Sequence, residues 1–270
     1  MHLDPYVESV LIFTGINVVM AISLYLPVSA GLLSLGQGGF MAIGAFASAY
    51  LTTALATPFA PALLAGGALA GLVGLLVGFP ALRIKGIYLI ILTMGFGEIV
   101  RVLFLNLEPT GGASGLSGIA PHTTLPVVAA AAGLALAFCW QLRDSRIGWA
   151  LNAVREDELA AETVGINLTR TKLSVFSLGA FIAGIGGGLY AHFTMFIDPA
   201  QFGFQRSAEI FIMVLLGGMG NFLGAALGAV VFTLLPELLR GLQDWRMTFF
   251  GTALVVMMIV RPWGLIGARR

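Results

Sequence analysis

The chain has 270 residues, of which 58% are hydrophobic and only 10% are charged, and its mean hydropathy is +0.96. Soluble domains carry about 25% charged residues, so a chain of this composition cannot cover a globular surface with water-solvated groups, and lipid must be most of its solvent. The net charge of +1 argues against nucleic acid as a partner, and the single cysteine, Cys139, excludes an internal disulfide and a cysteine-based metal or redox site.

The composition predicts an all-α membrane protein, a polytopic bundle of transmembrane helices that forms a single domain over 1–270. A spanning helix needs about 20 mostly apolar residues. Clear candidates cover 7–28, 32–53, 61–79, 87–107, 125–142 and 173–196. The apolar stretch 208–239 is too long for one ordinary span and contains the helix breakers of 217–221, so we expect two short segments there. With a last span over 247–260, the expected total is about eight or nine membrane segments, with Gly-broken helices among them.

Residues 143–172 form a polar island between two apolar segments. Loops rich in Lys and Arg lie on the cytoplasmic side of a membrane, which places this island inside. With the break at 217–221 counted, the loop at 83–85 and the C-terminal segment 261–270 also fall inside. Ten of the 14 Lys and Arg residues then lie in the cytoplasm. We therefore expect the N-terminus outside and the C-terminus inside.

Within the island, the sequence predicts one helix over 149–164 that ends at Gly165. The segment is rich in helix-forming residues, and a glycine directly after a helix is a common C-cap. Small residues give one weakly apolar face, and Arg155, Glu158 and Glu162 are spaced so that they can share a polar face. The pattern fits a solvated interfacial helix, and it also fits a helix that docks into a cleft of a soluble subunit.

Signatures of catalysis and nucleotide binding are missing from the sequence. No Gly-x-x-x-x-Gly-Lys-Ser/Thr phosphate loop and no His-Glu-x-x-His motif occur, and His2, His122 and His192 lie far apart along the chain. We therefore expect a protein that is not an enzyme and that holds no metal ion or cofactor of its own.

Several segments resemble those of one known family. Residues 145–167 are similar to the cytoplasmic loop of the permease subunits of branched-chain amino acid ABC importers. That loop carries a Glu-x-Ala-Ala-x-x-x-Gly-like element, matched here by Glu158, Ala160, Ala161 and Gly165. Further segments that fit the family are 33–45, 96–101, 110–118 and 261–265. Their order and spacing suit the LivM-type subunit rather than LivH, although subunits of this type often carry extra hydrophobic residues at the N-terminus.

The resemblance implies a bacterial inner-membrane importer with several subunits. This chain would pair with a homologous second permease subunit, two cytoplasmic ATPase subunits would bind the ATP, and an extracytoplasmic substrate-binding protein would deliver the substrate. The island 143–172 would be the cytoplasmic coupling loop to an ATPase. The residues expected to carry the coupling are Arg155, Glu156, Asp157, Glu158, Ala160, Ala161, Glu162 and Gly165. Relatives of the same family carry urea or short amides, and an ion-coupled secondary transporter is the alternative from another class.

Two glycine-rich breaks are candidates for the substrate pathway. Each break places one amide side chain among glycines in apolar surroundings. The residues are Gly36, Gln37 and Gly38 in the first half of the chain, and Gly217, Gly218 and Asn221 in the second. Transporters often place broken helices at the substrate site. Close helix packing through small residues explains the same pattern.

Three further expectations concern residues near the outer side of the membrane. The stretch 108–124 is rich in Gly and Ser and predicts an irregular external loop. The residues of this loop expected to contact the binding protein are Gly111, Gly112, Ser114 and Gly115. Glu98 and Arg101 lie three residues apart within a span, where unpaired charges are expensive, so the sequence favours a structural ion pair over a gate. Glu209, near an expected span end, is assigned to the membrane interface.

Overall fold

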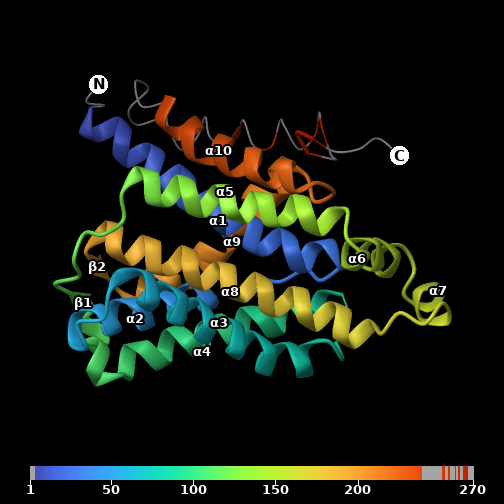
Figure 1. Ribbon diagram of the computed structural model, residues 1–270, viewed down its shortest axis with the longest axis horizontal. Helices are drawn as coiled ribbons and strands as arrows, with labels where there is room; N and C mark the ends of the chain where they lie inside the picture. The colour runs from blue at the N-terminus through green and yellow to red at the C-terminus, as the bar shows by residue number, and fades with distance from the viewer. Residues whose placement is uncertain are drawn as a thin grey trace.

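The computed structural model describes residues 4–84 and 86–238, together with residues 251, 252, 255, 259, 261 and 264–266. In these residues the long helices lie side by side as a bundle (Figure 1). The α-helices are α1 (Pro5–Ser29), α2 (Gln37–Ala54), α3 (Phe59–Ala81), α4 (Ile87–Asn106), α5 (Leu125–Arg143), α6 (Arg146–Glu156), α7 (Glu158–Thr163), α8 (Leu168–Thr194), α9 (Phe204–Gly217) and α10 (Phe222–Leu238). Short 3-10 helices and strands complete the fold: η1 (Glu108–Thr110), η2 (Gly112–Ser114), η3 (Pro199–Phe202), β1 (Leu116–Ser117) and β2 (Phe196–Ile197).

Five of the described helices are long and apolar enough to cross a membrane: α1, α3, α4, α5 and α8. Their bounds agree closely with the expected segments, because an apolar run of the right length predicts a span without any tertiary information. The segment Pro199–Gly217, which comprises η3 and α9, satisfies the same test together with α10, but the two are bent by 119° at the break between them. The described residues do not confirm the expected count of eight or nine segments, and the expected span over 247–260 lies largely outside them.

The second expected segment, 32–53, is wrong at its start. Residues 32–36 are not helical, and α2 begins only at Gln37. The Leu35 amide donates to Thr93 Oγ1 of α4 at 3.0 Å, so a side chain satisfies a backbone donor that a helix would have satisfied. Irregular backbone at membrane depth is tolerated only where it is buried in protein or lines a water-filled cavity. Thr93 of α4 therefore helps to stabilise the non-helical segment 32–36, which contains the start of the first glycine-rich break.

Glycines allow α8 to approach α2 and α3 closely. A Cβ built on Gly44 of α2 would collide with the backbone of Gly184 in α8, and a Cβ built on Gly187 would collide with the Met41 carbonyl group. On the other side of α8, a Cβ on Gly184 would lie 3.0 Å from the Gly67 Cα in α3. Packing of small residues is a principal source of helix association in lipid, where apolar side chains gain little by leaving acyl chains. This contact places α8 at the centre of the bundle.

The bundle has two different ends (Figure 1). Strands β1 and β2 lie at one end and pair antiparallel, with Leu116 opposite Ile197, whereas α6 and α7 project beyond the spanning helices at the other end. The loop 108–124 is therefore more ordered than the sequence indicated. Gly115 has a φ of 72°, and a Cβ on it would lie 2.5 Å from the Ile197 carbonyl oxygen. The strand pairing thus requires glycine at this position.

We expect Gly44→Ala to destabilise the bundle by about 1–3 kcal/mol, the usual range for an over-packed core, because the added methyl group has no space against Gly184. Gly95→Ala on α4 is the matched control, since nothing lies within 4 Å of a Cβ at that position. Thermal unfolding in detergent, followed by intrinsic fluorescence, compares the two variants. Equal unfolding midpoints would contradict the close-packing account.

Candidate functional site

The polar island folds as two short helices. Between α6 and α7 the backbone of Asp157 is extended, with φ −153° and ψ 111°. Its Oδ1 accepts hydrogen bonds from the amides of Leu159 and Ala160 at 2.9 and 3.1 Å, so Asp157 is the N-cap of α7. The expectation of one helix over 149–164 is wrong because this cap stabilises a new helix start in place of a continued turn.

The break also separates the charges that were expected to share one helix face. Arg155 lies at the end of α6, whereas Glu158 and Glu162 belong to α7. Glu158 Oε1 accepts from Lys172 Nζ of α8 at 2.6 Å, and Lys172 is only 7% exposed. This ion pair ties α7 to the first turns of α8.

Gly165 ends the second helix as the sequence predicted. Its φ is 87°, its amide donates to the Glu162 carbonyl at 3.0 Å, and the Ile166 amide donates to the Ala161 carbonyl at 3.1 Å. This pair of hydrogen bonds is the Schellman motif. No atom lies within 4 Å of a Cβ built on Gly165, so the backbone conformation, not lack of space, calls for glycine there.

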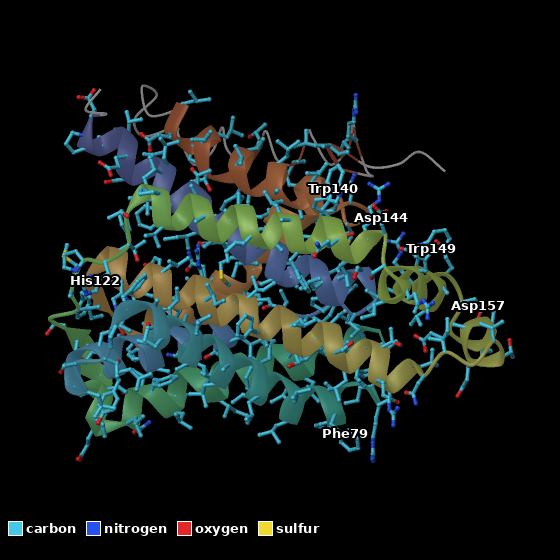
Figure 2. All side chains as sticks on the ribbon, viewed as in Figure 1. Phe79, His122, Trp140, Asp144, Trp149 and Asp157 are labelled. Carbon is cyan, nitrogen blue, oxygen red and sulfur yellow. The ribbon has the colours of Figure 1, made fainter. Side chains whose placement is uncertain are left out.

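Large apolar side chains are exposed on the island. The four that are 52–76% exposed are Ile147, Trp149, Leu159 and Val164. Of the expected coupling residues, the structure exposes Arg155, Glu156, Asp157, Ala160, Glu162 and Gly165, half-buries Glu158 and buries Ala161. Figure 2 shows Trp149 and Asp157 at the end of the molecule opposite His122. Exposed apolar side chains that gather among polar ones mark a site of contact with another protein or with the membrane surface. Trp149 was not among the expected coupling residues, although a tryptophan in a polar segment is itself a signal of a contact surface.

The loop residues expected to contact a binding protein lie together at the opposite end of the bundle. Gly111, Gly112 and Gly115 have positive φ angles and form the turns that join η1, η2 and β1. Ser114 is exposed between them. The loop therefore presents a defined surface.

The structure does not bring the two glycine-rich breaks together. The Gly38 amide donates to Ser207 Oγ, in the first turn of α9, at 3.0 Å, whereas Gly217 is the last residue of α9. Ten residues of helix, at a rise of 1.5 Å each, separate these two points by about 15 Å. Gly36 precedes α2, and Gly218, with a φ of 109°, follows α9.

The amide side chains of the two breaks contact different neighbours. Gln37 is 1% exposed and lies 3.4–3.5 Å from the hydroxyl and carbonyl oxygens of Ser23 in α1. Asn221 Oδ1 accepts from the Leu223 amide at 3.0 Å, at the start of α10. These are contacts of helix packing and capping. A role of these residues in the substrate pathway stays a prediction.

Two intrahelical ion pairs lie near the start of α9. Arg101 Nε and Glu98 Oε2 are 2.7 Å apart, as the sequence predicted, and Glu98 Oε1 also accepts from the Phe204 amide at 3.1 Å. The second pair joins Arg206 Nη1 to Glu209 Oε2 at 3.0 Å. The second pair was not expected, although Arg206 and Glu209 have the same three-residue spacing as Glu98 and Arg101.

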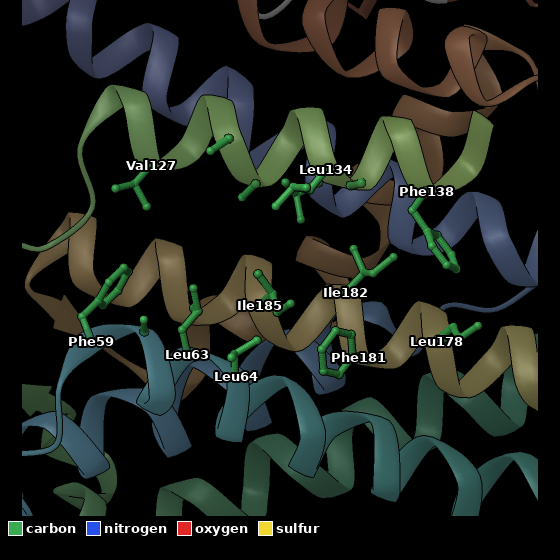
Figure 3. A pocket seen from close by; sticks show the side chains of 15 residues that line it. Phe59, Leu63, Leu64, Val127, Leu134, Phe138, Leu178, Phe181, Ile182 and Ile185 are labelled. Carbon is green, nitrogen blue, oxygen red and sulfur yellow. The ribbon is translucent and has the colours of Figure 1, made fainter. Parts of the chain in front are cut away.

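Two of the cavities formed by the described residues, both between helices of the bundle, differ in their chemistry. The larger has a volume of about 630 Å³ and lies between α5 on one side and α3 and α8 on the other, and its 15 lining residues are all apolar (Figure 3). The smaller, of about 300 Å³, is lined by Tyr190, Gln201, Arg206 and Glu209 among others. An ionised group is costly to transfer to apolar surroundings, so of these two cavities the smaller is the one that suits a charged ligand. Among the described residues, no cluster of three His, Cys, Asp or Glu side chains could hold a metal ion.

Comparison with known proteins identifies the family. Residues 6–260 match the family described as the branched-chain amino acid transport system permease component. The chain belongs to this family. The high-affinity branched-chain amino acid transport system permease proteins LivM of Salmonella typhimurium (strain LT2) and Escherichia coli (strain K12) are 37% and 36% identical to it, over 95% of this chain and 67% of theirs. The LivH permease protein of Escherichia coli (strain K12) is 30% identical over 47% of this chain and 41% of its own length. No solved structure matches the chain.

The family membership agrees with the fold. A permease family and five apolar helices of spanning length together make the chain a polytopic membrane protein. The LivM relatives match twice as much of the chain as the LivH relative of the same organism, which confirms the LivM-type resemblance.

Proposed function

We propose that this chain is a permease subunit of an ABC importer that moves branched-chain amino acids across the bacterial inner membrane. The observation that carries the proposal is the similarity to LivM permeases over 95% of the chain. In this proposal a second, homologous permease completes the membrane part, two cytoplasmic ATPase subunits bind ATP, and an extracytoplasmic binding protein delivers the substrate. This chain itself catalyses no reaction and holds no cofactor, and residues 1–270 form one permease domain.

The island 143–172 couples the permease to an ATPase subunit. Helices α6 and α7 project at one end of the bundle and expose Trp149 and Leu159, and the Glu158–Lys172 ion pair ties α7 to the central helix α8. A displacement of α7 by an ATPase therefore acts directly on a 27-residue helix of the membrane domain. The end with α6 and α7 lies in the cytoplasm, and the end with β1 and β2 faces the binding protein.

The complex, purified with its native subunits and reconstituted in liposomes, should import leucine, isoleucine and valine when ATP and the binding protein are supplied. Urea and acetamide should not be imported. Uptake of radiolabelled substrates measures both. Uptake of urea above that of leucine would assign the complex to amide transport. Import by a preparation without an ATPase subunit would favour a secondary transporter.

Gly165→Val should reduce the amount of leucine imported per ATP hydrolysed several-fold. A β-branched residue with a φ near 87° is strained, at a cost of about 1–2 kcal/mol, and the end of α7 would have to open. Gly165→Asn is the control, since asparagine adopts this backbone region more readily. The ratio of uptake to ATP hydrolysis is measured in the same liposomes. If the valine variant has the wild-type ratio of uptake to ATP hydrolysis, the backbone conformation at the end of α7 plays no part in coupling.

The proposed sidedness can be tested with single cysteines in a Cys139→Ala background. Ser114→Cys should react with a membrane-impermeant maleimide added to spheroplasts, and Asn152→Cys, on the exposed surface of α6, should react only in inverted vesicles. Labelling is read by mass spectrometry. The reverse pattern would invert the topology.

A further inference from the structure

The smaller cavity lies where α1, α2, η3, α8 and α9 meet, and it brings opposite charges to one place. Its volume of about 300 Å³ is at the lower end of the range of roughly 300–1,000 Å³ that is usual for ligand sites. Arg206 and Glu209 line it, with their nearest nitrogen and oxygen 3.0 Å apart. The Arg206 guanidinium carbon lies 6.0 Å from the centre of the Tyr190 ring, and the Tyr190 hydroxyl donates to Gln201 Oε1 at 3.3 Å.

This charged pair is held at the middle of a spanning helix. Arg206 Nη2 donates to Asn17 Oδ1 of α1 at 2.8 Å. Asn17 is equally far in sequence from Pro5 and Ser29, the ends of α1, which places it about 18 Å from each. A charge at this depth costs on the order of 2.5–3.5 kcal/mol on insertion scales, and substrate sites of transporters lie near the bilayer midplane. This position, which is deeper than the interfacial one expected for Glu209, favours a functional role for the pair.

One wall of the cavity is connected along the chain to the end of the bundle that carries β1 and β2. Its lining residues Gln201 and Gln205 are exposed, and η3, which contains Gln201, follows β2 directly along the chain. In the proposed orientation this is the outer side, from which substrate arrives. The first glycine-rich break also lies beside the cavity, because Gly38 contacts Ser207 and the next turn of α2 contributes Met41 to the lining.

A purely structural network explains only part of this arrangement. Asn17 Nδ2 also donates to Thr233 Oγ1 at 2.9 Å, so Asn17 and Arg206 join α1, α9 and α10. Glu209 and Tyr190 each contact Arg206, and together with Gln201 they also border the cavity. The junction alone does not explain why these polar groups face a cavity.

We propose that this cavity binds the zwitterionic head of a free α-amino acid during transport. Arg206 binds the carboxylate, for which a guanidinium offers two parallel N–H donors, and Glu209 binds the ammonium group. Phe13, Met41 and Phe202 line the remainder of the cavity and receive an apolar side chain. The inference rests on the proposed function and adds to it the residues that recognise the class of substrate.

The charge pattern discriminates against ligands that carry one charge or none. A carboxylic acid without an amino group would place its anion beside Glu209, and an amine without a carboxylate would place its cation beside Arg206. Urea or a short amide would separate Arg206 from Glu209, but it carries no charge that could pair with either side chain. A molecule with adjacent opposite charges satisfies both side chains.

The first test is leucine binding to the intact complex in nanodiscs, without the binding protein, measured by scintillation proximity. Leucine should bind, whereas 4-methylpentanoate, which lacks the ammonium group, and 3-methylbutan-1-amine, which lacks the carboxylate, should not compete. Glu209→Gln should weaken leucine binding by about tenfold or more, as expected for the loss of one charge-assisted hydrogen bond. Glu98→Gln is the matched control, since it removes the same charge from a pair with the same spacing outside the cavity. It should leave leucine affinity within about twofold.

Cysteine protection gives a second readout that does not depend on removal of a membrane-buried charge. In the Cys139→Ala background, saturating leucine should slow maleimide labelling of Gln201→Cys several-fold, and the two analogues should not. Ser114→Cys is exposed at the same end but lies outside the cavity, so its labelling rate should not change.

The outcomes separate this inference from the proposed function. If the wild-type complex imports leucine but Gln201→Cys is not protected, or if Glu209→Gln and Glu98→Gln bind leucine equally, the cavity is not the amino-acid site and the importer assignment stands. Competition by either analogue as strong as that of leucine would also overturn the inference. If the complex imports none of the branched-chain amino acids, the proposed function fails. Protection of Gln201→Cys by leucine would then still support an amino-acid site.

Discussion

Close contact between glycines of α2, α3 and α8 is the constraint on which the rest of the structure depends. Apolar side chains gain little by meeting one another instead of acyl chains, so helices in lipid associate through dispersion contacts at short backbone distances. Gly184 lies between Gly44 and Gly67: a Cβ on Gly44 would collide with the Gly184 backbone, and a Cβ on Gly184 would lie 3.0 Å from the Gly67 Cα. Because this contact fixes α8 at the centre of the bundle, α8 joins two sites: Lys172 near its start holds α7, and Tyr190 near its end lines the polar cavity.

Polar groups inside the bundle follow a second constraint, that each backbone group freed by a break needs a partner in the absence of water. Thr93 accepts from the irregular segment before α2, and Glu98 accepts from the first residue of α9. These partners turn two interruptions of regular helix into fixed features. The Arg206 side chain also has a partner inside the protein, since it donates to Asn17. Its ion pair with Glu209, however, borders a cavity, where both side chains can contact a bound ligand.

The sequence predicted what depends on local information. Apolar run length was enough to locate five spanning helices, and the C-cap at Gly165 follows from the residues around it. The split at Asp157 was also readable, because an aspartate before Glu-Leu-Ala-Ala is an N-cap signal, but strong helix propensity on both sides hid it. The sequence alone did not indicate which residues far apart in the chain contact one another. The start of α2 depends on Thr93, 58 residues from its partner, and the cavity depends on Arg206 meeting Asn17 from 189 residues away.

The mutual pairing of Arg206 and Glu209 limits how tightly the proposed site can bind. A zwitterion that enters replaces one ion pair by two, and the guanidinium and carboxylate give up part of their attraction to each other in return. The net gain is therefore smaller than two new charge pairs would suggest. A site on a transport path needs this property, because binding must be favourable enough for entry and weak enough for release. The bond from Arg206 to Asn17 keeps the guanidinium in place while Glu209 changes partner, so the anchor for the carboxylate stays fixed throughout the exchange.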